Sequence, residues 1–292
     1  MYDLIIIGMG VSGISGAIYA KRAGLKVLLL DHSAPGGTLN IIPEIENYPG
    51  IDNISGPDLA MNLFNTVNKL GIEYKLEEVT DVILDNIKTV KTKDNAYQSK
   101  YILIASGRKP KMLGLKDEDK YIGNGISTCA LCDGAFFKGK EVAVIGGGSS
   151  AVSEALYLSK IVKKVYLIHR REEFRAENTL IDKLKQIKNI ELILKNEVTS
   201  LITDNNQLIG LKLKDRDINI SGMFLYIGFI PNTDFLHNTA LKLENGYIIV
   251  DSNGETNIEG VYAAGDVTKK EIYQIINAAS EGALAAINIS KN

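Results

Sequence analysis

The sequence has 292 residues, of which 45% are hydrophobic and 23% are charged, and its formal net charge is -2. This length suits two domains, and the charge balance does not favour nucleic acid as a partner. The first apolar run is only four residues long without a basic flank, and no stretch approaches the roughly 18 apolar residues of a membrane helix, so we expect a cytoplasmic protein with no membrane partner.

The chain begins with a strand, a helix and a second strand. Residues 2–7 are a short apolar run before a glycine, which predicts a buried parallel strand. Residues 12–23 predict a helix that ends at Gly24, and residues 26–30 predict a strand that ends at Asp31. These three elements form a βαβ unit.

The same pattern returns in the middle of the chain. Residues 141–145 predict a strand, residues 149–161 a helix and residues 165–168 another strand. The glycine turns of the two units begin at Gly8 and Gly146, an offset of 138 residues. So long an offset indicates two nucleotide-binding domains rather than an array of short repeats.

Two glycine-containing segments mark the joints between these domains. Residues 106–111 follow a predicted strand at 101–104, and residues 228–232 follow a predicted strand at 223–227. The final block, 260–292, contains a strand, a turn and a long helix. Two close crossings between domains would form a hinge. The predicted domains are a discontinuous one at 1–110 and 232–292 and an inserted one at 111–231.

The first glycine turn has the pattern G-x-G-x-x-G between a predicted strand and a predicted helix. Gly8 makes the turn, Gly10 lets the backbone approach a pyrophosphate, and Gly13 lets the helix pack closely on the strand. The helix N-terminus attracts the anion, and Asp31 accepts hydrogen bonds from a ribose hydroxyl. The alternative is a tight strand-to-helix turn that binds no ligand.

The second glycine turn is followed by cations instead of an acid. Beyond its G-x-G-x-x-A pattern, the next strand ends at His169-Arg170-Arg171, with Arg175 nearby. Guanidinium groups at this point suit the 2′-phosphate of NADP(H) better than NAD(H). The alternative is that these arginines pair with Glu172 or Glu173 on the surface. The predicted NADPH-binding residues are Gly146, Gly148, Ser149, Ser150, Ala151, His169, Arg170, Arg171 and Arg175.

The two cysteines of the chain, Cys129 and Cys132, form a C-x-x-C pair. A zinc site needs four ligands, but there is no second such pair and none of the three histidines is suitably spaced, so we expect no metal. Inert buried thiols are a second possibility. We favour a redox dithiol, in which one thiolate attacks the disulfide of a partner and the other resolves it. Asp133 is either a proton shuttle or a turn residue before Gly134.

Several separated motifs, in the same order along nearly the whole chain, resemble those of the low-molecular-weight thioredoxin reductases. They are the glycine turn at Gly8, Pro35-Gly36-Gly37, Glu46-Asn47-Tyr48-Pro49-Gly50, Cys129-Ala130-Leu131-Cys132-Asp133-Gly134, the turn from Gly146 to Ala151, His169-Arg170-Arg171 with Phe174-Arg175-Ala176, and Gly265-Asp266-Val267.

The resemblance implies an α/β fold with two Rossmann-like, three-layer ββα nucleotide-binding domains, the second inserted in the first. It implies FAD in the discontinuous domain, NADPH in the inserted one, and a homodimer that reduces thioredoxin or a similar small dithiol protein. Cys132 then faces the flavin, Cys129 attacks the protein substrate, and Asp133 acts as acid and base. The implied FAD-binding residues are Gly8, Gly10, Ser12, Gly13, Asp31, Gly36, Gly37, Thr38, Asn47, Gly265, Asp266, Tyr273 and Gln274.

Three residues depart from the family pattern. Thr38 replaces a usual glutamine, Tyr273 replaces a common arginine, and Phe229 replaces a frequent histidine. These departures keep open a relative with ferredoxin as donor, although the intact second glycine turn and arginine cluster favour NADPH. The acceptor could also be a glutaredoxin-like protein, a peroxidase subunit or a low-molecular-weight disulfide. A protein that is not an enzyme, a redox sensor that only holds nucleotides, would carry the same motifs.

Overall fold

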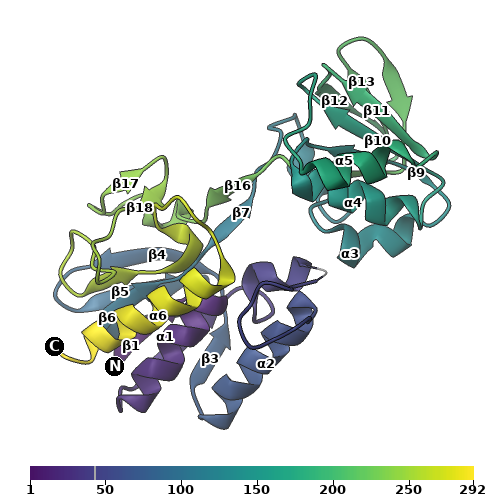
Figure 1. The fold of residues 1–292 in the computed structure, drawn as a ribbon. Helices are drawn as coiled ribbons and strands as arrows, with labels where there is room; N and C mark the ends of the chain where they lie inside the picture. The colour runs from purple at the N-terminus through teal and green to yellow at the C-terminus, as the bar shows by residue number, and fades with distance from the viewer. Residues whose placement is uncertain (43) are drawn as a thin grey trace. The chain divides into compact units, whose positions relative to one another are not determined.

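The computed structural model describes residues 1–42 and 44–292, which divide into two compact units (Figure 1). The first unit contains Met1–Lys109 and Ile230–Asn292, and the second contains Pro110–Phe229. The two boundaries lie one and two residues before the expected domain boundaries. None of the helices in these described ranges is long and apolar enough to cross a membrane.

A parallel sheet forms the centre of the first unit. Its strands lie in the order β3-β2-β1-β6, and β19 pairs with the other side of β6. The central strand β1 is buried because apolar layers cover both faces of the sheet, which explains its continuous run of aliphatic residues. The strands are β1 (Tyr2–Ile7), β2 (Val27–Asp31), β3 (Glu73–Leu76), β6 (Ala96–Ile104) and β19 (Val261–Ala263).

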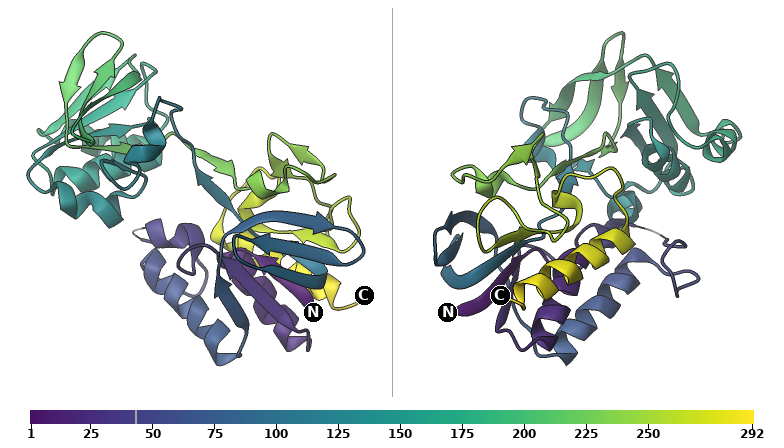
Figure 2. Two further views of the ribbon diagram at one scale, coloured as in Figure 1. Left: turned by 180° about the vertical axis from the view of Figure 1, so that it is seen from behind. Right: turned by 60° about the vertical axis from the view of Figure 1, so that its left-hand side comes forward.

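Three helices cover one face of this sheet: α1 (Val11–Arg22), α2 (Gly56–Lys69) and α6 (Ile275–Ile289). The right-hand view of Figure 2 shows the yellow α6 alongside α1. Gly282 allows the two helices to approach closely, because a Cβ at this position would overlap the carbonyl of Ser12. Helices α1 and α6 confirm the predicted first helix and the predicted long final helix.

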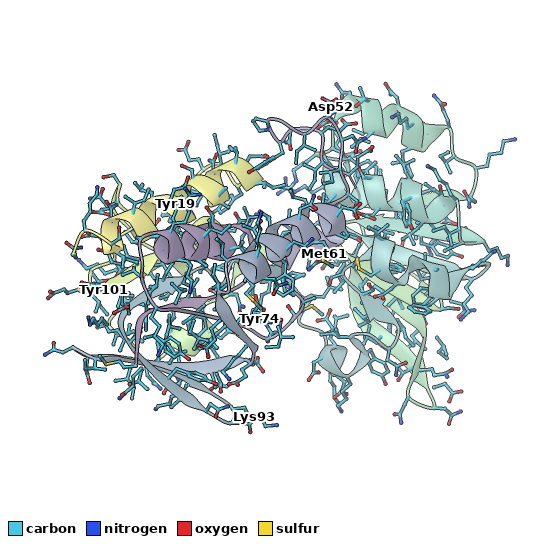
Figure 3. All side chains as sticks on the ribbon, turned by 90° about the horizontal axis from the view of Figure 1, so that it is seen from below. Tyr19, Asp52, Met61, Tyr74, Lys93 and Tyr101 are labelled. Atoms are coloured by element: carbon cyan, nitrogen blue, oxygen red, sulfur yellow. A yellow bond between two sulfur atoms is a disulfide. The ribbon has the colours of Figure 1, made fainter. Side chains whose placement is uncertain are left out.

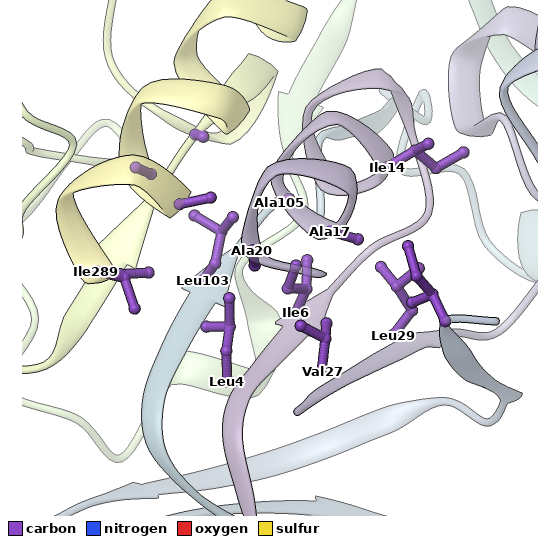
Figure 4. Packing of buried hydrophobic residues seen from close by; sticks show 14 of the residues in the cluster. Leu4, Ile6, Ile14, Ala17, Ala20, Val27, Leu29, Leu103, Ala105 and Ile289 are labelled. Atoms are coloured by element: carbon purple, nitrogen blue, oxygen red, sulfur yellow. The ribbon is translucent and has the colours of Figure 1, made fainter. Parts of the chain in front are cut away.

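The apolar core between helices and sheet consists of aliphatic side chains. Figure 4 shows Leu4, Ile6 and Leu103 from the sheet beneath Ala17 and Ala20 of α1. All five side chains are fully buried. At roughly 25 cal/mol per Å² of buried apolar surface, such contacts are the main stabilising contribution to the unit.

An antiparallel meander covers the other face of the sheet, with β4 (Val79–Leu84) and β5 (Lys88–Thr92) continuing from the first half of β6. Val82, Val90 and Ile248 pack beneath it, in a second core on the opposite side of the parallel strands. Helices, parallel sheet and meander make three layers. No separate strands were expected at the meander from the sequence.

The second unit repeats this architecture. Its parallel sheet has the order β11-β10-β9-β15-β8. Helices pack on one face and a three-stranded antiparallel sheet on the other, which confirms the predicted α/β class. The elements are β8 (Ile126–Ser127), α3 (Ala130–Asp133), β9 (Glu141–Ile145), α4 (Ser149–Ser159), β10 (Lys164–His169), α5 (Asn178–Lys185), β11 (Ile190–Leu194), β12 (Val198–Asp204), β13 (Gln207–Leu213), β14 (Asp217–Asn219) and β15 (Gly222–Leu225).

Two predicted elements in this unit end two residues earlier in the structure. The helix expected to reach residue 161 ends at Ser159, because the chain turns there and the N–H groups of Ile161 and Val162 both donate to Leu158. The strand expected at 223–227 begins and ends earlier, at Gly222–Leu225. The following residue, Tyr226, has left the strand and turns its side chain toward the cysteine loop.

The two connecting segments are short strands rather than loops. β7 (Arg108–Pro110) and β16 (Phe229–Pro231) pair with each other in a two-stranded sheet, labelled in Figure 1. The sequence predicted linkers at both places. Their glycines and prolines do not prevent this pairing, since each segment satisfies backbone hydrogen-bonding groups of the other.

Candidate functional site

Cys129 and Cys132 are joined by a disulfide across one turn of helix α3, with their Cα atoms 5.3 Å apart. Cys129 occupies the N-cap of this short helix, and the backbone N–H of Cys132 donates to its sulfur at 3.0 Å. A hydrogen bond to sulfur at a helix start stabilises a thiolate. After reduction of the disulfide, this hydrogen bond would stabilise negative charge on the Cys129 sulfur.

The two cysteines differ in accessibility. Cys129 is only 7% exposed, whereas Cys132 lies on the surface. An accessible Cys132 suits the expected role of contacting an electron donor. An attack by Cys129 on another protein, however, requires that its sulfur become more accessible than it is in this structure.

Hydrogen bonds hold the loop around the disulfide in place. The N–H of Cys129 donates to Ser127 Oγ at 3.0 Å, and the N–H of Ala130 donates to the hydroxyl of Tyr226 at 2.8 Å. Burial, followed by the charge of Glu154, raises the pKa of Tyr226. The phenol therefore stays neutral and can keep accepting this hydrogen bond.

Asp133 follows the disulfide and lines a cavity of about 720 Å³ within the second unit. Ser127 and Lys140 line the same cavity, and so does Phe136, whose side chain is 75% exposed. Such an exposed aromatic beside a cavity is typical of a surface that binds another molecule. Asp133 thus directly follows the disulfide in the sequence and lies on the wall of this cavity.

Glu154 is a buried carboxyl in α4, the helix that packs against α3. Within residues 1–42 and 44–292 its Oε2 atom has no hydrogen-bond partner, and burial raises its pKa to about 7. This residue was not predicted as part of the site, because its helical position does not reveal which side chains cover it. A carboxyl with this pKa changes charge near neutral pH.

The second glycine turn lies between β9 and α4. Gly146 has a φ of +148°, and a Cβ there would overlap the carbonyl of Tyr226, so only glycine fits. A Cβ at Gly148 would meet no atom within 4 Å, which leaves open space before the helix. Helix α4 has no side-chain cap and no acid in its first turn. These features fit a pyrophosphate at the helix start.

The predicted cationic cluster follows β10. His169 is buried against Gly147 and stacked on Phe174, with ring centroids 5.7 Å apart. Burial lowers the pKa of His169, so the ring is neutral at pH 7. His169 is therefore built into the turn, as a packing residue that supports the nucleotide-binding loop.

The three arginines of this cluster, by contrast, are exposed. No salt bridge in the described part of the chain involves Arg170, Arg171 or Arg175, and Glu172 pairs with Lys195 instead. This arrangement disfavours the alternative in which the arginines neutralise neighbouring glutamates. Their guanidinium groups are available to hold a phosphate.

The first glycine turn has the same construction. Gly8 has a φ of +111°, a Cβ at Gly13 would overlap the carbonyl of Gly8, and Gly10 faces open space. Asp31 accepts a hydrogen bond from the N–H of Met9 at 2.6 Å. Burial raises the pKa of Asp31, but its hydrogen bonds, with that to His32 the largest, outweigh burial and lower the pKa overall. An ionised carboxylate at this strand end fits a ribose hydroxyl.

Other predicted FAD-binding residues surround this turn. Gly37 lies beside Gly10, and Thr38 follows on an exposed turn of 3₁₀ helix. Asn47 donates to the side chain of Gln274 at 3.3 Å, which joins the second motif to the start of α6. Gly36, Ser12 and Gly265 also lie at this end of the sheet, and a Cβ at Gly265 would overlap Ser12 Oγ.

One residue of this site was absent from the predicted set. Arg108, in β7, donates to Asp266, and its guanidinium lies over the ring of Tyr273. Neither spacing nor motif could reveal it, since 158 residues separate Arg108 from Asp266. The two predicted nucleotide-binding sets themselves fall in different units: the FAD set in the first and the NADPH set in the second.

Comparisons with known proteins agree with this geometry. Residues 2–282 match the family model described as "Pyridine nucleotide-disulphide oxidoreductase". A thioredoxin reductase of Listeria innocua is 38% identical, over 100% of this chain and 93% of that protein. A crystal structure of Lactococcus lactis thioredoxin reductase (FR conformation) has a TM-score of 0.90 and 36% identity, and covers 100% of this chain and 98% of that one.

A more distant structure is relevant to the electron donor. A ferredoxin-flavin thioredoxin reductase from Clostridium acetobutylicum has a TM-score of 0.56 and is 31% identical, over 99% of this chain and 97% of that one. All three of these similar proteins are called thioredoxin reductases, and of the three names that of the Clostridium protein also gives ferredoxin.

The buried Glu154 predicts a pH-dependent stability. The pKa of Glu154 in the folded protein is about 7, above the ordinary value of 4.5, because burial disfavours the charged form. The free energy of unfolding should therefore decrease as pH rises from about 4.5 to 7. Glu154→Gln should be about 3 kcal/mol more stable than the natural chain at pH 8 and nearly equal at pH 4. Urea unfolding at the two pH values measures this. Glu197→Gln, at an exposed ion pair, is the matched control, and equal effects of both substitutions would contradict the assignment.

Proposed function

Because the chain belongs to the pyridine nucleotide-disulphide oxidoreductase family, we propose that it is an NADPH-dependent thioredoxin reductase that binds FAD in its first unit. The observation that carries the proposal is the Cys129–Cys132 disulfide, held on a short helix in the unit that also contains the second glycine turn and the exposed arginines. A redox-active cysteine pair gives the electrons an acceptor within the chain itself.

The chain's own residues provide two nucleotide sites and one dithiol. Gly8, Gly10 and Asp31 would hold the FAD, and Gly146 with Arg170 and its neighbours would hold the NADPH. When bound, these groups supply hydride-derived electrons to the disulfide. The protein places the groups and keeps competing acceptors away.

The sulfur chemistry follows from the positions of the cysteines. Two electrons break the Cys129–Cys132 bond and leave two sulfurs, one of which is protonated from Asp133 while Cys129 stays a thiolate. The Cys129 thiolate attacks the disulfide of thioredoxin, forms a mixed disulfide and releases one thioredoxin thiolate, which takes up a proton. Cys132 then returns its proton to Asp133, attacks the Cys129 sulfur and restores the original disulfide, and the second thioredoxin sulfur leaves as a thiolate that takes up a proton.

The cavity beside Asp133 supports a protein acceptor. Its exposed Phe136 and the adjacent Lys140 would lie against the surface of the partner while the sulfurs exchange. A free low-molecular-weight disulfide would not need an exposed aromatic side chain such as Phe136 beside the dithiol. This comparison favours thioredoxin, or a similar small dithiol protein, over a small-molecule acceptor.

The opposite exposures of the cysteines make their roles testable by trapping. If Cys129 attacks thioredoxin, Cys132→Ser removes the resolving thiol and should accumulate a stable mixed disulfide with thioredoxin. Cys129→Ser should form none, should lose thioredoxin turnover, and should still allow NADPH to bleach the flavin. Non-reducing electrophoresis measures the adduct. Accumulation in Cys129→Ser would show instead that the exposed Cys132 is the attacking residue.

The exposed arginines predict the choice of nicotinamide. Joint replacement of Arg170 and Arg171 by alanine should raise the KM for NADPH at least about tenfold, because two charge-assisted contacts to a phosphate are lost, and should leave NADH little changed. Arg216→Ala, which removes a surface guanidinium paired with Glu191, is the control. Steady-state turnover gives the KM for each nucleotide, and anaerobic titration of the flavin absorbance shows whether each nucleotide reduces the flavin.

The outcome of this titration also tests the donor itself. A yellow protein that NADPH does not bleach would contradict the proposed donor and point to ferredoxin. Flavin that NADPH bleaches, without turnover of any disulfide acceptor, would point to a redox sensor.

We also propose that the protein acts as a homodimer. Ile276, Leu284 and Ile287 are exposed on α6, and Tyr19 is exposed on the neighbouring α1 (labelled in Figure 3). Apolar side chains gathered on two adjacent helices favour coverage by another protein surface. Sedimentation should give twice the chain mass of 31.9 kDa, and Leu284→Glu should shift it toward the monomer. A natural chain that sediments as a monomer would contradict the proposal.

A further inference from the structure

Arg108 contacts two residues, Asp266 and Tyr273, that lie more than 150 positions later in the sequence. Its Nε and Nη2 atoms donate to Asp266 Oδ2 at 3.1 and 2.7 Å, and both side chains are mostly buried, with 20% and 25% of their surface exposed. Two bonds from one guanidinium fix the orientation of the carboxylate far better than a single flexible contact would. In the described part of the chain, no hydrogen bond reaches the other oxygen, Oδ1. That oxygen can accept a hydrogen bond from a ligand.

The same guanidinium also fixes an aromatic ring. Its Cζ lies 4.0 Å from the ring centroid of Tyr273, within the range of a cation–π contact. The ring of Tyr247 also lies next to Tyr273, and the two ring centroids are 5.9 Å apart. Burial and the hydrogen bond to Tyr247 raise the pKa of Tyr273, so its phenol stays neutral. Arg108 therefore holds an acid and an aromatic residue in one arrangement.

This arrangement lies among the residues expected to hold the flavin. Asp266 follows Gly265, which packs on Ser12 at the first glycine turn. Tyr273 precedes Gln274, which bonds to Asn47. Tyr273 also stands where an arginine is common in the resembling family. Position 273 therefore has no guanidinium of its own, but the guanidinium of Arg108 in β7 lies over the face of the Tyr273 ring.

We propose that Arg108 is a positioning residue of the flavin site, which orients Asp266 and Tyr273 and takes the place of an arginine at position 273. This inference rests on the proposed binding of FAD by the first unit. Removal of Arg108 would leave the carboxylate of Asp266 without its counter-charge and free to rotate. Both the affinity for FAD and the spectrum of the bound flavin would then change.

The test measures FAD binding rather than turnover. Full-length protein is stripped of flavin and titrated with FAD, and the dissociation constant, the visible circular dichroism and the midpoint potential are recorded. Arg108→Ala should weaken FAD binding about tenfold and alter the dichroism and the potential. Lys109→Ala is the matched control, because the neighbouring Lys109 pairs with Asp234, which is well exposed, and should stay within about twofold of the natural chain.

A second substitution tests the replacement itself. Adding Tyr273→Arg to Arg108→Ala should restore the affinity and the spectrum, and failure to do so would overturn the replacement of the arginine at 273. Arg108→Lys keeps the charge but loses the two-point contact, so it should lie between the natural chain and Arg108→Ala. It also serves as the deciding variant if Arg108→Ala does not fold.

The outcomes separate this inference from the proposed function. Natural affinity and dichroism in both Arg108→Ala and Arg108→Lys would overturn the role of Arg108 and leave the proposed function intact. Failure of the natural chain to bind FAD would overturn both.

Discussion

The structure depends on close contact between backbone atoms at two glycine turns. Gly13 lets α1 lie directly on the carbonyl of Gly8, and Gly146 packs on the carbonyl of Tyr226. Because no side chain separates these atoms, each helix begins at the carboxyl end of its sheet with its N–H groups pointing outward. An added methyl group would push the helix away from the strand. The two proposed nucleotide sites therefore depend on the absence of side chains at a few positions.

The same principle explains why the two units resemble each other although their ligands are expected to differ. Each has a parallel sheet, helices on one face and antiparallel strands on the other. What distinguishes them is the end of the strand after the glycine turn, where Asp31 stands in the first unit and exposed arginines stand in the second. A single architecture thus gives one site suited to a ribose hydroxyl and another suited to a phosphate. The disulfide belongs to the second unit only.

Local patterns predicted the parts of the fold that are encoded locally. The apolar run at 2–7, the two glycine turns and the C-x-x-C pair gave both βαβ units, the fold class and the redox pair. The meander strands β4 and β5 were not predicted, because short strands with mixed polar residues have little periodic signal. The pairing of β7 with β16 depends on segments more than a hundred residues apart, which no local pattern reveals.

The unpredicted features of the site have the same cause. Arg108 meets Asp266 through the tertiary fold, and the burial of Glu154 depends on which elements cover its helix. The spacing of the cysteines indicated a disulfide but could not indicate that Cys129 is buried and Cys132 exposed. Sequence motifs thus identified the chemical groups, whereas accessibility and charge state came from packing.

Tyr226 connects two parts of the second unit that motifs treat as separate. Its backbone carbonyl packs on Gly146 of the nucleotide turn, while its hydroxyl accepts the N–H of Ala130 beside the disulfide. A substitution at this position must therefore preserve two properties: the path of the backbone beside Gly146 and a hydroxyl at the end of an aromatic ring. Fewer residues meet both requirements than meet either one alone, although Tyr226 belongs to neither motif.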